Sequence, residues 1–142
     1  MAHKKASILV TRSIPKVGLK MLESYFTNVE VNEEDRPLTR EELLAKVKGK
    51  DAVLCLLNDK IDKDVMLAAG KKCKIFSNYA VGYENIDVKE ANKRKIFVTN
   101  TPDCLTNTTA DMAIALLFAC ARRTVEADKF CREGKFKGWG PN

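Results

Sequence analysis

The sequence predicts an α/β fold with five parallel strands, and two observations carry the prediction. Short apolar runs alternate, over about the first hundred residues, with amphipathic segments that begin at helix-capping residues. Such alternation favours a parallel sheet whose strands are joined by right-handed helical crossovers. Beyond Thr106 only helical periodicity continues, to about Gly134. We therefore expect a flavodoxin-like layer of five parallel strands with flanking helices, followed by a long C-terminal helix.

Three of the five expected strands lie in the first 56 residues. They cover Ser7–Val10, Val29–Val31 and Ala52–Leu56, of which the first is an apolar run. Pro15 opens the first helix, because proline is tolerated in the first turn of a helix and not in its interior. The apolar positions of this helix are Val17, Leu19, Met21 and Leu22. Thr39 begins the second helix, which runs through Val47, and Glu42 has the capping-box spacing from it.

The next forty residues supply the other two strands and two shorter helices. The strands cover Lys74–Ser77 and Ile96–Thr99. Asp62 caps a helix over Val65–Ala69, which Gly70 ends. Asp87 caps the following helix. The residues between the fourth strand and this last helix, Asn78–Asn85, are the connecting loop.

The C-terminal part is expected to be helical, with a break near Arg122 and Arg123. Thr108 has the capping-box spacing to Asp111, and Thr106 is an equally good cap. The run Met112–Ala121 is apolar on every face, so other protein must surround it, either a second domain or a second subunit. We expect a domain over residues 1–101 and a hinge with a long interdomain or dimerisation helix over residues 102–142.

The loop Asn78–Asn85 is the strongest candidate for a binding site. In a parallel sheet, loops at the carboxyl ends of strands hold small ligands, and successive backbone amides there can cradle an anion. Gly82 allows either a positive φ or a close approach of a ligand to the main chain. We therefore expect the amides of Val81 and Gly82 to bind a carboxylate. The alternative is an ordinary turn, because Gly and Asn are common turn residues.

Composition argues against several other functions. The 25 Lys and Arg residues exceed the 19 Asp and Glu by six, but they are interspersed with acidic residues, which does not favour nucleic-acid binding. The five cysteines include no CxxC pair, and the one histidine is His3, so a zinc site or a Cys/His nucleophile is not expected. The longest apolar run is about half a membrane-spanning helix, and we expect a cytoplasmic protein.

Two motifs of the sequence are specific in combination: NYAVGYENID and KRKIFVTNTPDCLTNTTADMAIALLFACAR. They resemble the D-2-hydroxyacid dehydrogenase family, and most closely its glyoxylate and hydroxypyruvate reductase branch. The resemblance extends upstream through ILVTRSIPKVGLKML and LCLLNDKID, and downstream to FCREGKFKGWGP, so that it covers nearly the whole chain. It implies an oxidoreductase that uses NAD or NADP and acts on small 2-oxo and 2-hydroxy acids.

The resemblance also implies roles for individual residues. Val81 and Gly82 match the loop that binds the substrate carboxylate beside the nicotinamide, and Thr109 matches a position near that ring. Leu57 matches a residue that lines the substrate pocket, and the alternative is that it only packs in the core.

Other residues match the parts of the family between domains and subunits. Asn100, Thr101 and Pro102 match the hinge between the domains, where Pro102 forces Thr101 to be extended. Trp139 and Pro141 resemble a segment that reaches the substrate pocket of the neighbouring subunit. Met112–Ala121 resembles the helix that leads into the dimer contact.

The catalytic groups that the family uses have no counterpart in this sequence. Reduction of a 2-oxo acid needs a proton donor, a cation and a nicotinamide cofactor. The family supplies a histidine paired to a glutamate, an arginine and a GxGxxG turn. Here the glycines of the only cluster follow a helical segment and lack that spacing. We expect an N-terminal fragment that is inactive alone. The alternatives are a stand-alone small-acid-binding or assembly module and a corepressor-like scaffold.

Overall fold

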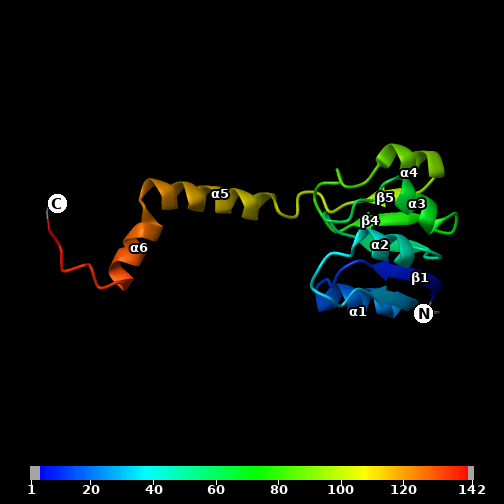
Figure 1. The fold of residues 1–142 in the computed structure, drawn as a ribbon, viewed down its shortest axis with the longest axis horizontal. Coiled ribbons are helices and arrows are strands. Elements are labelled where there is room, and N and C mark those ends of the chain that lie inside the picture. Colours follow the sequence, from blue (N-terminus) through cyan, green and yellow to red (C-terminus); the bar gives the residue numbers. More distant parts are fainter. Residues whose placement is uncertain (1–3, 141–142) are drawn as a thin grey trace. The chain divides into compact units, whose positions relative to one another are not determined.

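The computed structural model describes residues 4–140, and the chain divides into two compact units between Pro102 and Asp103. Within residues 4–102 the first unit forms a five-stranded sheet with every pairing parallel, in the order β2-β1-β3-β4-β5 (Figure 1). The strands are β1 (Lys4–Val10), β2 (Phe26–Val31), β3 (Ala52–Cys55), β4 (Ile75–Asn78) and β5 (Phe97–Thr99). The predicted flavodoxin-like sheet is confirmed, since this strand order is typical of that fold.

Helices connect the strands, and local capping sets where most of them start. They are α1 (Lys16–Tyr25), α2 (Arg40–Lys46), α3 (Lys63–Ala69) and α4 (Val88–Arg94). Thr39 forms the predicted capping box with Glu42, and hydrogen bonds from the Arg36 side chain and the Thr39 backbone lower the pKa of Glu42 to about 2. Asp62 and Asp87 cap α3 and α4 as predicted, by accepting backbone N–H groups of the first turn.

Helix α1 leaves apolar positions exposed. It has no buried residue, and the side chains of Val17 and Met21 are 74% and 62% exposed. The physical reason is the position of α1, which packs mainly on β2, the edge strand of the sheet. No residue of β2 is fully buried. An apolar helix face can be covered only as far as the neighbouring sheet extends.

The hydrophobic core lies under the central strands and is closed by α2, α3 and α4. Its largest fully buried side chains are Phe76, Leu9, Ile61 and Met66. At the carboxyl ends of the strands the buried residues become polar: Thr11 follows β1 and Asn78 ends β4, and each is 1% exposed or less. Buried polar side chains must find hydrogen-bond partners, so this edge of the sheet carries an ordered polar network.

The second unit contains two helices within residues 103–140, α5 (Thr106–Ala121) and α6 (Thr124–Arg132). The predicted break is confirmed at Arg123, which has a left-handed backbone with φ of 50°. The predicted capping of α5 is wrong: its first turn has no side-chain cap, and the Thr108 hydroxyl donates to the carbonyl of Leu105 instead. Among the described residues, no helix is both long and apolar enough to span a membrane.

Candidate functional site

The candidate loop leaves the carboxyl end of β4 and enters α4, in the first unit. Its start is fixed by the N–H of Tyr79, which donates to the carbonyl of Cys55 on the adjacent strand at 2.7 Å. Its end is fixed by a parallel bridge between Ile61 and Ile86. The loop therefore spans two anchored points at the edge where parallel α/β sheets hold their ligands.

The carbonyl groups of the loop are held by the protein, whereas its amides are not. The N–H of Thr101 donates to Ala80 O at 2.8 Å, the Nδ2 of Asn100 to Val81 O at 2.7 Å, and the Nδ2 of Asn78 to Gly82 O at 2.8 Å. Within residues 4–140, no acceptor is bonded to the N–H of any residue from 80 to 85. Consecutive amides without acceptors form a concave site that suits an anion.

Two asparagines hold the loop in this shape. Asn78 is 1% exposed, and its Nδ2 also donates to Oδ1 of Asn85 at 3.0 Å. The Nδ2 of Asn85 donates to the carbonyls of Leu56 and Asp59 at 3.1 and 3.0 Å. These bonds join the loop after β4 to the turn after β3. Neither asparagine was assigned a role from the sequence, although the alternation along β4 places Asn78 on the same face as Phe76, the core face.

Gly82 does not take the positive φ that the sequence left open, so that explanation is wrong. The other explanation, a close approach to the main chain, agrees with its surroundings. A Cβ atom at Gly82 would collide with a carboxylate oxygen of Glu84, which lies directly against the glycine. The absence of a side chain at residue 82 therefore lets a carboxylate group, here that of Glu84, approach the main chain closely.

Leu57 lies in the turn after β3 and is 55% exposed, which excludes the core-packing alternative. The turn is held by the buried carboxylate of Asp59, which accepts the N–H of Leu56 at 2.8 Å and the hydroxyl of Thr11 at 2.5 Å. Because Asn85 bonds the same turn, an exposed apolar side chain is fixed relative to the amide-rich loop. Leu57 is thus free to contact a ligand.

The thiols and the titratable side chains suggest no other chemistry. All five cysteines are free, and burial raises the pKa of the Cys55 thiol to about 12, so it stays protonated. Its Sγ lies 3.5 Å from Oδ1 of Asn78, as a weak donor in the asparagine network. Among the described residues, no group of three His, Cys, Asp or Glu side chains is arranged to hold a metal ion.

The other residues singled out from the sequence fall in both units. Asn100 and Thr101 bond the carbonyl side of the loop, and Pro102 is the last residue of the first unit. Thr109 lies in the first turn of α5, where its N–H donates to Leu105 O, and Trp139 is 90% exposed; both belong to the second unit. His3 and Pro141 lie outside the described residues.

The fold defines the class: an α/β domain with a 2-1-3-4-5 parallel sheet, in which the loop after β4 has amides without acceptors within residues 4–140. The family model of the D-isomer specific 2-hydroxyacid dehydrogenase catalytic domain matches residues 8–133. The chain belongs to this family.

Similar proteins of known name and structure agree with the family. The glyoxylate reductase of Pyrococcus furiosus is 53% identical, and that of Thermococcus onnurineus 52% identical, each over 136 residues that make up 96% of this chain and 40% of the relative. The crystal structure of the TT0316 protein from Thermus thermophilus matches with a TM-score of 0.85 and 39% identity, over 96% of this chain and 43% of that chain.

A second solved structure has a bound cofactor. It is the NAD⁺-bound 3-phosphoglycerate dehydrogenase of Entamoeba histolytica, which matches with a TM-score of 0.66 and 26% identity, over 98% of this chain and 43% of that chain. In all of these comparisons the chain spans less than half the length of the protein it matches, and about 40% of the length of the named glyoxylate reductases.

Proposed function

We propose that this chain is the substrate-binding part of an NAD(P)-dependent oxidoreductase that reduces small 2-oxo acids of the glyoxylate and hydroxypyruvate type. The observation that carries the proposal is the loop at residues 80–85. The carbonyls of Ala80, Val81 and Gly82 accept hydrogen bonds from the protein, and the amides of the loop have no acceptor within residues 4–140. Family membership and the similarity to named glyoxylate reductases support the same class of substrate.

The proposed role of the loop follows from the chemistry of a 2-oxo acid. The carboxylate receives hydrogen bonds from the amides of Val81 and Gly82, and such charge-assisted bonds are stronger than neutral ones. Leu57 contacts the small remainder of the substrate from the turn after β3. Because the loop carbonyls already have donors, the amides keep their direction when no ligand is bound, which lowers the cost of ordering on binding.

The rest of the chemistry requires groups that this sequence does not contain. A bound nicotinamide would supply the hydride, and we propose that Val81 lies near its ring. Residues 4–140 do not fit the dinucleotide's pyrophosphate, since Gly134, Gly138 and Gly140 follow helix α6 and not a strand. The resemblance assigns no residue of this chain to the histidine acid or to the cation that binds the carbonyl, and we expect the 142-residue chain alone to be inactive.

A chimera tests this function. In it, the present chain replaces the corresponding 136 residues of the Pyrococcus furiosus glyoxylate reductase, whose remaining part is unchanged. We expect the purified chimera to oxidise NADH or NADPH when glyoxylate is added, because 53% identity over 136 residues preserves the fold that presents the loop. The measurement is the decrease of absorbance of the reduced cofactor.

The matched controls are the isolated chain and the unmodified relative. The isolated chain is expected to give no glyoxylate-dependent oxidation above the background. A folded chimera that binds the cofactor and fails to reduce any 2-oxo acid would contradict the proposal, and so would turnover by the 142-residue chain alone.

We also propose that two copies of the chain associate through Met112–Ala121. Five large apolar side chains of this segment are 55–61% exposed: Met112, Ile114, Leu116, Leu117 and Phe118. An exposed apolar surface of this kind usually marks an interface. Light scattering of the chain should give the mass of a dimer, and the double change Leu116→Lys and Phe118→Lys should shift it to a monomer. A monodisperse monomer of the unmodified chain would contradict this.

A further inference from the structure

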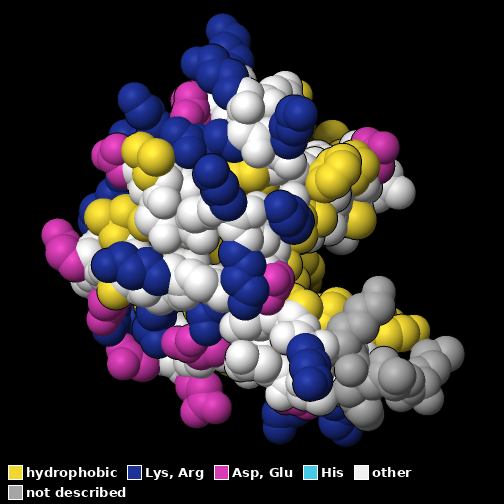
Figure 2. Space-filling model, turned by 90° about the vertical axis from the view of Figure 1, so that its right-hand side faces the viewer, with side chains coloured by type: hydrophobic (Ala, Val, Ile, Leu, Met, Phe, Trp, Pro, Cys, Tyr) yellow, Lys and Arg dark blue, Asp and Glu magenta, His cyan; other side chains and the backbone are white. Residues whose placement is uncertain are grey.

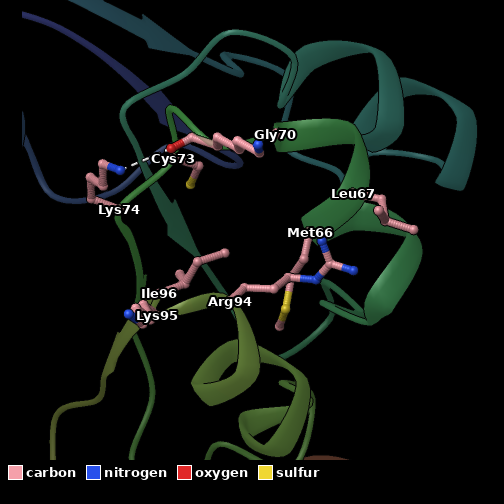
Figure 3. A pocket seen from close by; sticks show the side chains of 9 residues that line it. Met66, Leu67, Gly70, Cys73, Lys74, Arg94, Lys95 and Ile96 are labelled. Carbon is pink, nitrogen blue, oxygen red and sulfur yellow. Dashed lines mark hydrogen bonds between the residues drawn. The ribbon is translucent and has the colours of Figure 1, made fainter.

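A cleft of about 540 Å³ lies in the first unit, away from the candidate loop (Figure 3). Its walls come from the end of α3, from the residues before β4 and from the end of α4. Lys74 immediately precedes β4 and Ile96 precedes β5, so the cleft is at the amino edge of the sheet. The loop at residues 80–85 follows β4, at the opposite edge. The volume of the cleft is within the range of small-molecule sites.

The cleft combines an apolar floor with a basic rim. Met66, Cys73 and Ile96 are each 6% exposed or less and form the floor. The lining also contains Leu67, Gly70 and four basic residues, and no acidic residue belongs to it. The basic residues are Lys71, Lys74, Lys95 and Arg94. On the face shown in Figure 2, Lys and Arg side chains spread across the centre, whereas Asp and Glu lie mostly toward the edge.

Most of this positive charge has no partner in the protein. Arg94 donates through Nε to Glu90 at 2.7 Å, and the Nζ of Lys74 donates to the carbonyl of Lys71 at 2.9 Å. Within residues 4–140, the ammonium groups of Lys71 and Lys95 make neither an ion pair nor a hydrogen bond. Glu90 is also the only carboxylate bonded to a cation of the cleft among these residues, so a surplus of positive charge remains there.

Lys71 and Lys95 follow the C-terminal ends of α3 and α4, where basic residues are common because they interact with the last carbonyls. Within residues 4–140, neither ammonium group bonds such a carbonyl. The N–H of Gly70 bonds Met66 O, and the N–H of Lys95 bonds Ala91 O and Asn92 O. The side chains of Lys71 and Lys95 are left free to meet a ligand.

We propose that this cleft is a second small-molecule site, for an organic anion with an apolar body. The positive charge of Lys71, Lys95 and Arg94 around the cleft attracts the phosphate or carboxylate group, with Lys95 and the terminal nitrogens of Arg94 on separate sides of it (Figure 3). The bond of Arg94 to Glu90 holds its guanidinium in place. The apolar body lies on Met66, Cys73 and Ile96. The site is independent of the loop at residues 80–85, because the two are at opposite edges of one sheet.

Amide spectra of the ¹⁵N-labelled 142-residue chain test the site. Phenyl phosphate and benzoate are the probes, because each combines an apolar ring with one of the two anionic groups. Inorganic phosphate, which has no apolar body, and phenol, which has no anionic group, are the controls. Either probe should shift the amides of residues 66–74 and 94–96, with a Kd of about 1 mM. Tighter binding of phenyl phosphate would identify a phosphate ester as the ligand class, and tighter binding of benzoate a carboxylate.

Variants separate the proposed ion pairs from unspecific attraction. The double variant Lys71→Gln and Lys95→Asn removes two charges, and asparagine tolerates the left-handed backbone of Lys95, with its φ of 56°. It should weaken binding about five- to tenfold. The control Lys89→Gln changes an exposed lysine on α4 outside the cleft and should leave the Kd within about twofold.

Three results would overturn the proposal. The first is an unchanged Kd in the double variant, or shifts that map outside the cleft. The second is equal binding of phenol or of inorganic phosphate, since each lacks one half of the recognition. The third is binding to the unmodified chain that does not weaken at about 0.5 M salt, because partly exposed ion pairs are screened.

Discussion

Replacing Gly82 by alanine in the chimera is expected to raise the KM for glyoxylate about 10- to 100-fold, with a smaller change in kcat. The estimate corresponds to the loss of one hydrogen bond to a charged group. The backbone at Gly82 does not require glycine, so the variant should fold; the added Cβ instead fills the space that the carboxylate needs. A carboxylate contact made equally in the ground and transition states acts mainly on KM.

The side chain of Glu84 provides the control for this experiment. In the present structure the new Cβ would meet the Glu84 carboxylate, which is the far end of a flexible side chain. If displacement of Glu84 were the whole effect, the double variant Gly82→Ala and Glu84→Ala would regain the parent KM. We expect it to stay impaired, and Glu84→Ala alone to stay within about threefold of the parent, because Glu84 is exposed and its side chain makes no hydrogen bond within residues 4–140.

Replacing Asn78 by aspartate is expected to lower the free energy of unfolding of the chain by about 3 kcal/mol. The two side chains have nearly the same shape, so no cavity forms. A carboxylate, however, cannot donate to Gly82 O or to Oδ1 of Asn85, which now accept from Asn78 Nδ2. The change would leave a buried charge facing two acceptors. Urea unfolding followed by circular dichroism measures the loss.

Two comparisons make the Asn78 result specific. Asn92→Asp, on the exposed side of α4, should change the free energy of unfolding by no more than about 0.5 kcal/mol. The buried carboxyl should also have a raised pKa in the folded state, so that folding takes up a proton. Lowering the pH from 7 towards about 5 should then recover part of the lost stability. An unfolding midpoint equal to that of the parent at neutral pH would contradict the assigned role of Asn78.

Features determined by neighbouring residues in the chain were predictable from the sequence. The caps Thr39, Asp62 and Asp87 each bond an N–H two or three residues ahead, so spacing alone locates them. The break at Arg123 and the parallel order of the strands were also predicted correctly. The start of α5 was not, because Thr106 and Thr108 both had suitable spacing and neither forms a cap.

Features determined by tertiary contacts were not predictable. The partners of Asn78, Asn85 and Asp59 lie on other segments of the chain, and no local pattern shows them. The exposure of Val17 on α1 depends on how far the edge strand extends beneath the helix. For the loop, the sequence indicated which residues to consider. It did not show that the carbonyls are bonded and the amides are free, which is the property on which the proposed function depends.

The central claim is that the amides of Val81 and Gly82 bind a carboxylate, and an NMR titration of the ¹⁵N-labelled chain with D-glycerate tests it most directly. We predict saturable shifts of the amides of residues 80–85, largest at Val81 and Gly82, with a Kd on the order of millimolar. The amides of residues 66–74 and 94–96 should stay in place. Loop amides that do not move at about 20 mM D-glycerate, some twenty times the expected Kd, would contradict the account.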